Sequence, residues 1–352
     1  ADKIHDQAIR IRGVRTQKGE VVPRNVPQLF SGSSTGGAEP GAIPAEVSGR
    51  RELAEWLAGP AAPLVARVTV NRVWQHLFGE GLVRTVDNFG RMGEAPSHPE
   101  LLDWLAGEFI QRDWSLKWLV REIVLSRSWQ ASSRFDSAAF DIDPENRLLW
   151  RMPVRRLDAE PLRDAMLAIA GQLTVERSRA SVVGELDGNE LNDRIRLTPA
   201  QLNQTVRSLY LPLARMSLPE QLELFDFADP SLSIGQRGER ILPAQRLFLF
   251  NSELMHGLAT AAAQRLMNDA PDSPTRRVEL AWLRFFGRRP DSAEREIALE
   301  AVEQAMAGPS RSAAATAAAA PAEAAAETER ELRAWALLCQ ALFAAGEFQS
   351  LE

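Results

Sequence analysis

The chain has 352 residues, of which 45% are hydrophobic and 25% are charged, the balance of an ordinary globular protein of one or two domains. Its net charge of -6 argues against a nucleic-acid-binding protein, which normally carries a basic face. No run approaches the roughly 18 apolar residues of a membrane-spanning helix. The single cysteine, Cys339, excludes an internal disulfide, a cysteine-rich zinc site and a C-x-x-C-H haem attachment.

Residues 1–47 are predicted to be a lead-in from an upstream domain. The stretch 8–14 (AIRIRGV) alternates like a short strand. Glycine, serine and proline in residues 31–44 are typical of a flexible linker. No signal peptide opens the chain, and its first residues resemble the interior of a longer protein.

From residue 48 the pattern becomes helical. The stretch 50–58 places Leu53, Trp56 and Leu57 on one face and ends at Gly59. A second helix begins near Pro63 and ends at Gly79. Its apolar stripe consists of Val70, Val73, Trp74 and Leu77.

Two capped helices are predicted next. Ser97 and Glu100 form a capping-box pattern. The helix that follows it would bury Leu101, Leu102, Leu105 and Phe109. Ser115 can cap a further helix. Its apolar residues are Leu116, Leu119, Val120, Ile123 and Val124.

The second half of the chain alternates between helices and weaker patterns. Asp158 is predicted to cap a helix that Gly171 closes, and Ser273 one that Gly287 closes. The latter would bury Val278, Ala281, Trp282 and Phe285. Residues 173–251 look like loops and short extended pieces. A last helix over 329–345 carries Leu332, Trp335, Cys339 and Leu342 on one side.

Together these patterns predict a mainly α fold, an irregular multi-helix bundle with loop-rich insertions and a few short strands. The expected organisation is a lead-in (1–47), a helical core domain (48–308), an alanine-rich low-complexity linker (309–328) and a C-terminal helix that packs on the core (329–352).

One candidate site lies in residues 71–105, which hold two of the four histidines. His76, Asp87, His98 and Asp103 are the candidate catalytic groups of this stretch. Two histidines and a carboxylate suit zinc or iron, but no H-x-x-x-H spacing supports a metal site, and none is predicted. The alternative is structural: short polar residues satisfy turn backbone, and glycines permit positive φ. The structural interpretation is favoured.

Binding groups are predicted in the same stretch. Arg72, Trp74 and Arg84 are candidates for substrate binding. Seven of the nine tryptophans lie between Trp56 and Trp150, so a platform of exposed rings is conceivable. Core packing is favoured, because several of these rings lie on or beside apolar stripes.

A second candidate site lies in residues 155–166 (RRLDAEPLRDAM). Glu160 and Asp164 are four residues apart and are candidate catalytic carboxylates. Arg156, four residues before Glu160, and Arg163 are candidate binding groups. The alternative is a solvated charged face or a buried ion-pair network, which is the more common use of such a pattern. The motifs of serine hydrolases, P-loop proteins and Rossmann domains are absent from the sequence.

Several segments resemble one family in the same order. They are GRRELAEWL, the stretch 66–126, the stretch 143–167, RSLYLPLAR, FDFADPS and FNSEL. This string is similar to the planctomycete cytochrome-c-associated C-terminal domain, known as domain of unknown function family 1553. The resemblance is good over residues 49–263 and looser beyond. The chain departs from the family pattern at Ala62-Pro63 and at Arg246.

The resemblance implies an exported multidomain protein, located in the periplasm, outside the cell or in the cell envelope. Its upstream domains are the expected partners, with another envelope protein or a polysaccharide as further possibilities. A c-type haem would belong to an upstream domain, so no cofactor is expected in this chain. The family implies no catalytic residue.

Three functions follow from these observations. The favoured one is a non-catalytic helical interaction or scaffold module. The second is a metal-dependent or acid/base enzyme acting on extracellular polysaccharide or its breakdown products. The third is an accessory module for electron transfer to a haem on a partner.

Overall fold

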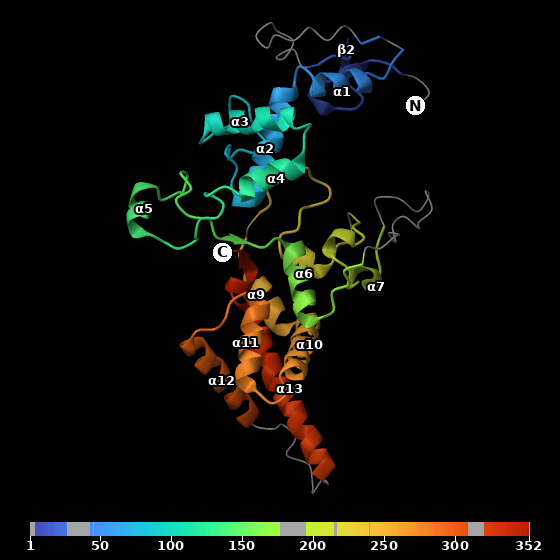
Figure 1. Ribbon diagram of the computed structural model, residues 1–352. Helices are drawn as coiled ribbons and strands as arrows, with labels where there is room; N and C mark the ends of the chain where they lie inside the picture. The colour runs from blue at the N-terminus through green and yellow to red at the C-terminus, as the bar shows by residue number, and fades with distance from the viewer. Residues whose placement is uncertain are drawn as a thin grey trace. The chain divides into compact units, whose positions relative to one another are not determined.

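The computed structural model describes residues 4–26, 43–44, 46–176, 195–214, 217–238, 240–308 and 320–351. These residues form a mainly α fold with two short antiparallel sheets, which confirms the predicted fold class (Figure 1). They divide into two compact units, Ala1–Pro153 and Val154–Glu352. Among the helices described, none has the length and apolar character to cross a membrane.

The first unit contains a β-hairpin followed by helices. The hairpin joins β1 (Gln7–Arg10) to β2 (Lys18–Val22), so the predicted strand ends at Arg10. The helices are α1 (Arg50–Ala58), α2 (Ala62–Phe78), α3 (Pro99–Gln111), α4 (Leu116–Val124) and α5 (Ser137–Ile142). The predicted linker 31–44 lies outside the described residues, apart from residues 43–44.

The core of the first unit lies where α2 packs against α3 and α4. Val70 and Trp74 of α2 share one buried cluster with Leu105 and Phe109 of α3, as their spacing predicted. The Trp74 ring stacks on Phe78 with ring centres 4.3 Å apart. Trp74 therefore serves packing and is covered from solvent.

Two predicted apolar stripes are narrower than expected. On α1 only Trp56 is buried, while Leu53 and Leu57 are exposed, because α1 packs mainly against α2. On α4 the buried residues are Leu119 and Ile123, and both Leu116 and Val120 are exposed. A periodic pattern marks a helix, but how much of its apolar face is covered depends on its neighbours.

The predicted starts of α3 and α4 had different outcomes. Ser115 caps α4, because its hydroxyl accepts the N–H of Trp118 at 3.3 Å. The capping box predicted for α3 is wrong. His98 occupies the cap position, and the Ser97 hydroxyl bonds Nδ1 of His98 at 3.0 Å instead of a helix N–H.

A buried amide fixes the connector between α2 and α3. Asn71 is fully buried, donates to the carbonyl of Val83 at 2.9 Å and accepts the N–H of the same residue at 2.8 Å. A Cβ on Gly81 would lie 2.6 Å from the Val83 carbonyl oxygen and 2.7 Å from the Asn71 amide nitrogen. Only glycine fits there, so this part of the connector serves geometry.

The second unit consists of a two-stranded sheet and helices. The sheet pairs β3 (Arg155–Arg156) with β4 (Ser350–Leu351). The helices are α6 (Ala159–Ala170), α7 (Pro199–Leu202), α8 (Glu220–Leu224), α9 (Pro243–Asn251), α10 (Glu253–Asp269), α11 (Pro274–Phe285), α12 (Ser292–Ala307) and α13 (Ala320–Ala344).

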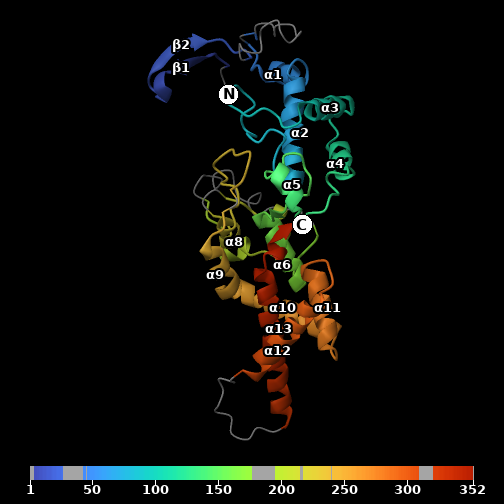
Figure 2. The same ribbon diagram turned by 90° about the vertical axis from the view of Figure 1, so that its left-hand side faces the viewer.

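Helix α10 is the centre of this unit, where it packs against α13 and α6 (Figure 2). Trp335 and Cys339 of α13 are buried in the shared core, as their spacing predicted. Burial raises the pKa of the Cys339 thiol to about 12, so the thiol is a packing group. Gln340, also buried, donates to the carbonyls of Leu249 and Phe250 and so holds the end of α9 on α13.

The boundaries in this unit were predicted with mixed success. Ser273 caps α11 and Gly171 closes α6, as predicted. Asp158 precedes α6 but makes no side-chain cap bond. Residues 173–251 were predicted to be loops and short extended pieces, but they include α9, which begins at Pro243. Helix α13 begins at Ala320, inside the predicted linker, since alanine favours helix; residues 309–319 of that linker lie outside the described part.

We predict that Asn71→Ala strongly destabilises the first unit. The change leaves the N–H and C=O of Val83 buried without partners, and each such group costs about 1–3 kcal/mol. The free energy of unfolding should therefore fall by about 2–4 kcal/mol, measured by urea titration of tryptophan fluorescence. Exposed Gln111→Ala is the control and should change it by less than about 0.5 kcal/mol. Equal stability of the two variants would contradict this role of Asn71.

We also predict that an ion-pair cluster around Arg288 in the second unit is sensitive to acid. Arg288 donates to Glu294 and to Glu347, and its bond lowers the pKa of Glu294 from 4.5 to about 2. A lowered pKa stabilises the fold above pH 4.5 and loses that effect as the pH falls towards 2. Arg288→Gln should raise the titration midpoint of the Glu294 carboxyl carbon, followed by NMR, from about 2 towards 4.5. An unchanged midpoint of the Glu294 titration would contradict the role of Arg288.

Candidate functional site

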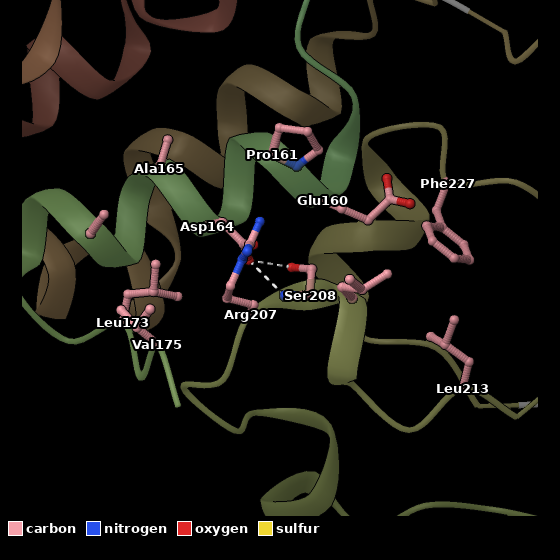
Figure 3. A pocket seen from close by; sticks show the side chains of 12 residues that line it. Glu160, Pro161, Asp164, Ala165, Leu173, Val175, Arg207, Ser208, Leu213 and Phe227 are labelled. Atoms are coloured by element: carbon pink, nitrogen blue, oxygen red, sulfur yellow. Dashed lines mark hydrogen bonds and ion pairs between the residues drawn. The ribbon is translucent and has the colours of Figure 1, made fainter. Parts of the chain in front are cut away.

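A cleft of about 730 Å³ lies in the second unit, along one face of α6 (Figure 3). Its opposite wall comes from the stretch 207–213. The polar residues that line it are Glu160, Asp164, Arg207 and Ser208. The larger apolar residues that line it are Leu173, Val175, Leu209, Leu213 and Phe227. The cleft therefore joins a polar strip to an apolar rim, as binding sites commonly do.

Helix α6 places both predicted carboxylates in this cleft. Glu160 and Asp164 are four residues apart, so they lie on the same face one turn from each other. The helix continues to Gly171, whose φ of 73° ends it in a left-handed turn. The prediction that these two side chains share a face is confirmed.

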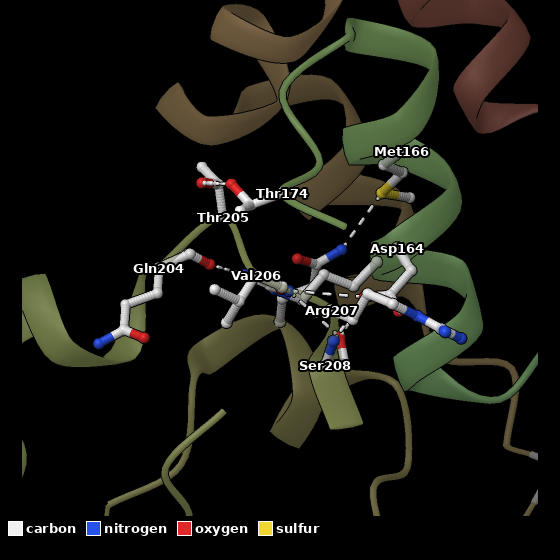
Figure 4. Close-up of polar contacts among 10 residues, drawn as sticks. Asp164, Met166, Thr174, Gln204, Thr205, Val206, Arg207 and Ser208 are labelled. Atoms are coloured by element: carbon white, nitrogen blue, oxygen red, sulfur yellow. Dashed lines mark hydrogen bonds and ion pairs between the residues drawn. The ribbon is translucent and has the colours of Figure 1, made fainter. Parts of the chain in front are cut away.

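Asp164 holds the opposite wall of the cleft. Its carboxylate accepts the N–H of Ser208 at 2.8 Å and the Ser208 hydroxyl at 2.7 Å (Figure 4). The Nε of Arg207 lies 3.8 Å from the same carboxylate. Only 18% of the Asp164 side chain is exposed, so these bonds act in a partly dry environment.

Arg163 holds the same wall from the buried side. Its guanidinium donates to the carbonyl of Val206 at 3.0 Å, to the Ser208 hydroxyl at 3.2 Å and to the carbonyl of Gln204. Burial lowers the pKa of this guanidinium. Arg163, a candidate binding group from the sequence, satisfies the backbone carbonyls of Gln204 and Val206 in the fold.

Glu160 is held by an arginine from a distant loop. Arg237 donates to its two carboxylate oxygens at 2.6 and 2.9 Å, and this bond raises the pKa of Arg237. The Arg237 guanidinium also lies over the ring of Phe227, 5.3 Å from its centre. The pair fixes Phe227 at the rim of the cleft.

Arg156 does not pair with Glu160, contrary to the spacing argument. It lies in β3, before the helix begins, so the i, i+4 geometry does not apply to it. Its guanidinium donates to Gln349 at 3.2 Å and to Gln245 at 3.4 Å. Gln245 is buried and donates in turn to the carbonyl of Leu224 at 3.0 Å. Arg156 thus belongs to a partly buried polar network beside β4.

The candidates of the first unit form separate ion pairs. Asp103 bonds Arg67 at 2.6 Å, which lowers the pKa of Asp103. Arg72 lies 3.8 Å from Asp87, on an exposed surface.

Arg84 and the two histidines complete the first stretch. Arg84 lies 3.1 Å from Glu80 and 3.0 Å from Glu145. His76 is exposed on α2, and His98 occupies the N-cap position of α3 without a side-chain cap bond. Across the described ranges, no three His, Cys, Asp or Glu side chains come together in a way that could hold a metal ion. The structure therefore places Glu160 and Asp164 of the second candidate stretch in one cleft and distributes the candidates of the first stretch over several contacts.

Sequence reasoning missed the residues of the far wall. Arg207, Ser208 and Leu209 sit in a stretch without clear periodicity, and Arg237 lies 77 positions from Glu160. One signal was available. The segment RSLYLPLAR, residues 207–215, is part of the family resemblance although no helix or strand pattern requires it.

We predict that Arg163 stabilises the second unit through the geometry of its guanidinium N–H donors and not only through its charge. Arg163→Met should lower the free energy of unfolding by about 2–4 kcal/mol, because buried carbonyls lose their donors. Arg163→Lys should restore less than half of this, since an ammonium cannot reproduce the geometry of a guanidinium. Hydrogen exchange of the Ser208 amide should speed up in both variants. Full rescue by lysine would show that charge alone is sufficient.

Comparison with known proteins adds the family. No match was found among curated proteins or among solved structures. One family model matches residues 49–302, most of the chain, including α6 and the stretch 207–213. Its description is PSD1, protein of unknown function (DUF1553). The chain, with its α6 cleft inside the matched region, belongs to this family.

Proposed function

We propose that this chain is a non-catalytic interaction module, which binds a polypeptide segment in the α6 cleft. The observation that carries the proposal is the combination of a fixed wall and an exposed apolar rim. Leu209 and Val175 are 75% and 70% exposed, and Leu213 is 41% exposed. Apolar side chains grouped beside a hollow are typical of surfaces that bind a partner.

The charged residues of the cleft support binding over acid/base chemistry. A general acid or base must exchange its proton with a substrate and therefore needs a carboxylate that is available to it. Asp164 is occupied by two hydrogen bonds from Ser208, and Glu160 by the two donors of Arg237. These contacts hold the rim of the cleft in place, so the two carboxylates have a structural role.

The rim of the cleft is preorganised for binding. Leu209 directly follows Ser208, whose N–H and hydroxyl are both held by α6. A side chain on a fixed backbone loses little freedom when it is covered, so more of its burial becomes affinity. As the partner we propose the part of the parent protein that the family resemblance places upstream.

Titration calorimetry with that upstream part, produced separately, tests the proposal. Leu209→Asp should weaken binding at least tenfold, because full burial of a leucine is worth about 1.5–3 kcal/mol. The matched control is Leu247→Asp on α9, since Leu247 is 61% exposed and lies outside the cleft lining. The control should bind like the unchanged chain. Absence of binding, or equal losses in the two variants, would overturn the proposal.

A further inference from the structure

The β1–β2 hairpin has an unusual surface for its size. Gln7 lies opposite Val22 and Ala8 opposite Val21, and the N–H of Ile11 donates to the carbonyl of Gln17 at 3.1 Å to close the turn. Figure 2 shows the hairpin extending sideways from α1, with its turn at the far end. The turn end is defined here as residues 9–18, all of which are exposed except the half-buried Arg10.

Apolar side chains on the hairpin are left uncovered. Ile9, Ile11 and Val14 of the turn end are 53%, 47% and 41% exposed, and Val21 of β2 is 60% exposed. None of them belongs to a hydrophobic cluster formed by the described residues. A two-stranded hairpin without a covered face is only marginally stable in water, so this element gains from a surface that covers it.

The charge of the turn end is opposite to that of the chain. Residues 7–19 include Arg10, Arg12, Arg15 and Lys18 and no acidic residue, whereas the whole chain carries a net charge of -6. The carboxylates nearest in sequence are Glu20, which is exposed on β2, and Asp6, which bonds Arg24 at 2.7 Å. Basic residues thus outnumber acidic ones and flank the exposed Ile11 and Val14 in the sequence, an arrangement complementary to an anionic surface with an apolar interior.

We propose that the turn end of this hairpin is a peripheral binding site for an anionic lipid surface. Basic side chains would lie among the lipid headgroups while Ile11 and Val14 enter the acyl boundary. A specific folded partner normally needs about 20–30 residues on each side, which exceeds the ten residues of the turn end. A fluid lipid surface has no such requirement for size or shape. This site goes beyond the proposed polypeptide binding and uses a different unit.

The charges predict the size of the effect. Each basic side chain near an anionic membrane strengthens binding roughly fivefold. Arg12, Arg15 and Lys18 are all exposed, so together they should favour anionic over neutral vesicles by roughly a hundredfold. The attraction falls off within the Debye length, so 0.5 M salt should remove most of it.

Co-sedimentation of the full chain with vesicles tests this directly. Vesicles of phosphatidylcholine with 30% phosphatidylglycerol should bind the chain, and vesicles of pure phosphatidylcholine should bind it at least tenfold more weakly. The triple variant Arg12→Glu, Arg15→Glu, Lys18→Glu should lose this preference. The double variant Ile11→Ser, Val14→Ser keeps every charge and should reduce binding at least threefold.

The control carries the same net charge elsewhere in the first unit. In it, three exposed arginines, Arg91, Arg121 and Arg147, are replaced by glutamate. This control should bind anionic vesicles like the unchanged chain. Far-UV circular dichroism shows whether each variant keeps its helices. No binding, equal binding to both vesicle types, or an equal loss in the control would overturn the proposal. None of these outcomes bears on the calorimetric test of the α6 cleft.

Discussion

The second unit depends on one local constraint: adjacent charged residues of α6 must satisfy the backbone of a loop more than forty positions away. Arg163 supplies donors to carbonyls of residues 204–206, and Asp164 accepts the N–H and hydroxyl of Ser208. Without these partners the loop would leave polar backbone groups dry and unpaired, which costs more than the ion pairs themselves contribute. The far wall of the cleft, and every property proposed for it, follows from that requirement.

The same principle operates in the first unit with a neutral side chain. Asn71 satisfies both backbone groups of Val83, and Gly81 leaves space for that approach. Both units thus position irregular segments by means of polar helix side chains that bond to backbone atoms. This use explains why polar residues inside helices, which suggest chemistry when read in sequence, take structural roles here.

The two proposed surfaces differ in their physical basis. The α6 cleft is concave and its rim is fixed, so binding there would depend on shape and apolar contact. The hairpin end is small, and its basic residues flank exposed apolar ones in the sequence, so binding there would depend on charge and on salt. A module that binds a polypeptide with one unit and a lipid surface with the other would hold its partner near a membrane. The enzyme and electron-transfer alternatives stay predictions from the sequence.

The sequence by itself determined what short-range physics controls: the mainly α fold, most ends of the helices that it predicted, the Ser115 and Ser273 caps, and the shared face of Glu160 and Asp164. Spacing fixes which residues share a helix face, because the helical repeat is constant. Only the tertiary structure decided what each face meets. It exposed Leu53 and joined Arg237 to Glu160 across 77 positions. Such long-range pairings depend on which distant segments the loops bring together, and a local sequence pattern does not indicate this.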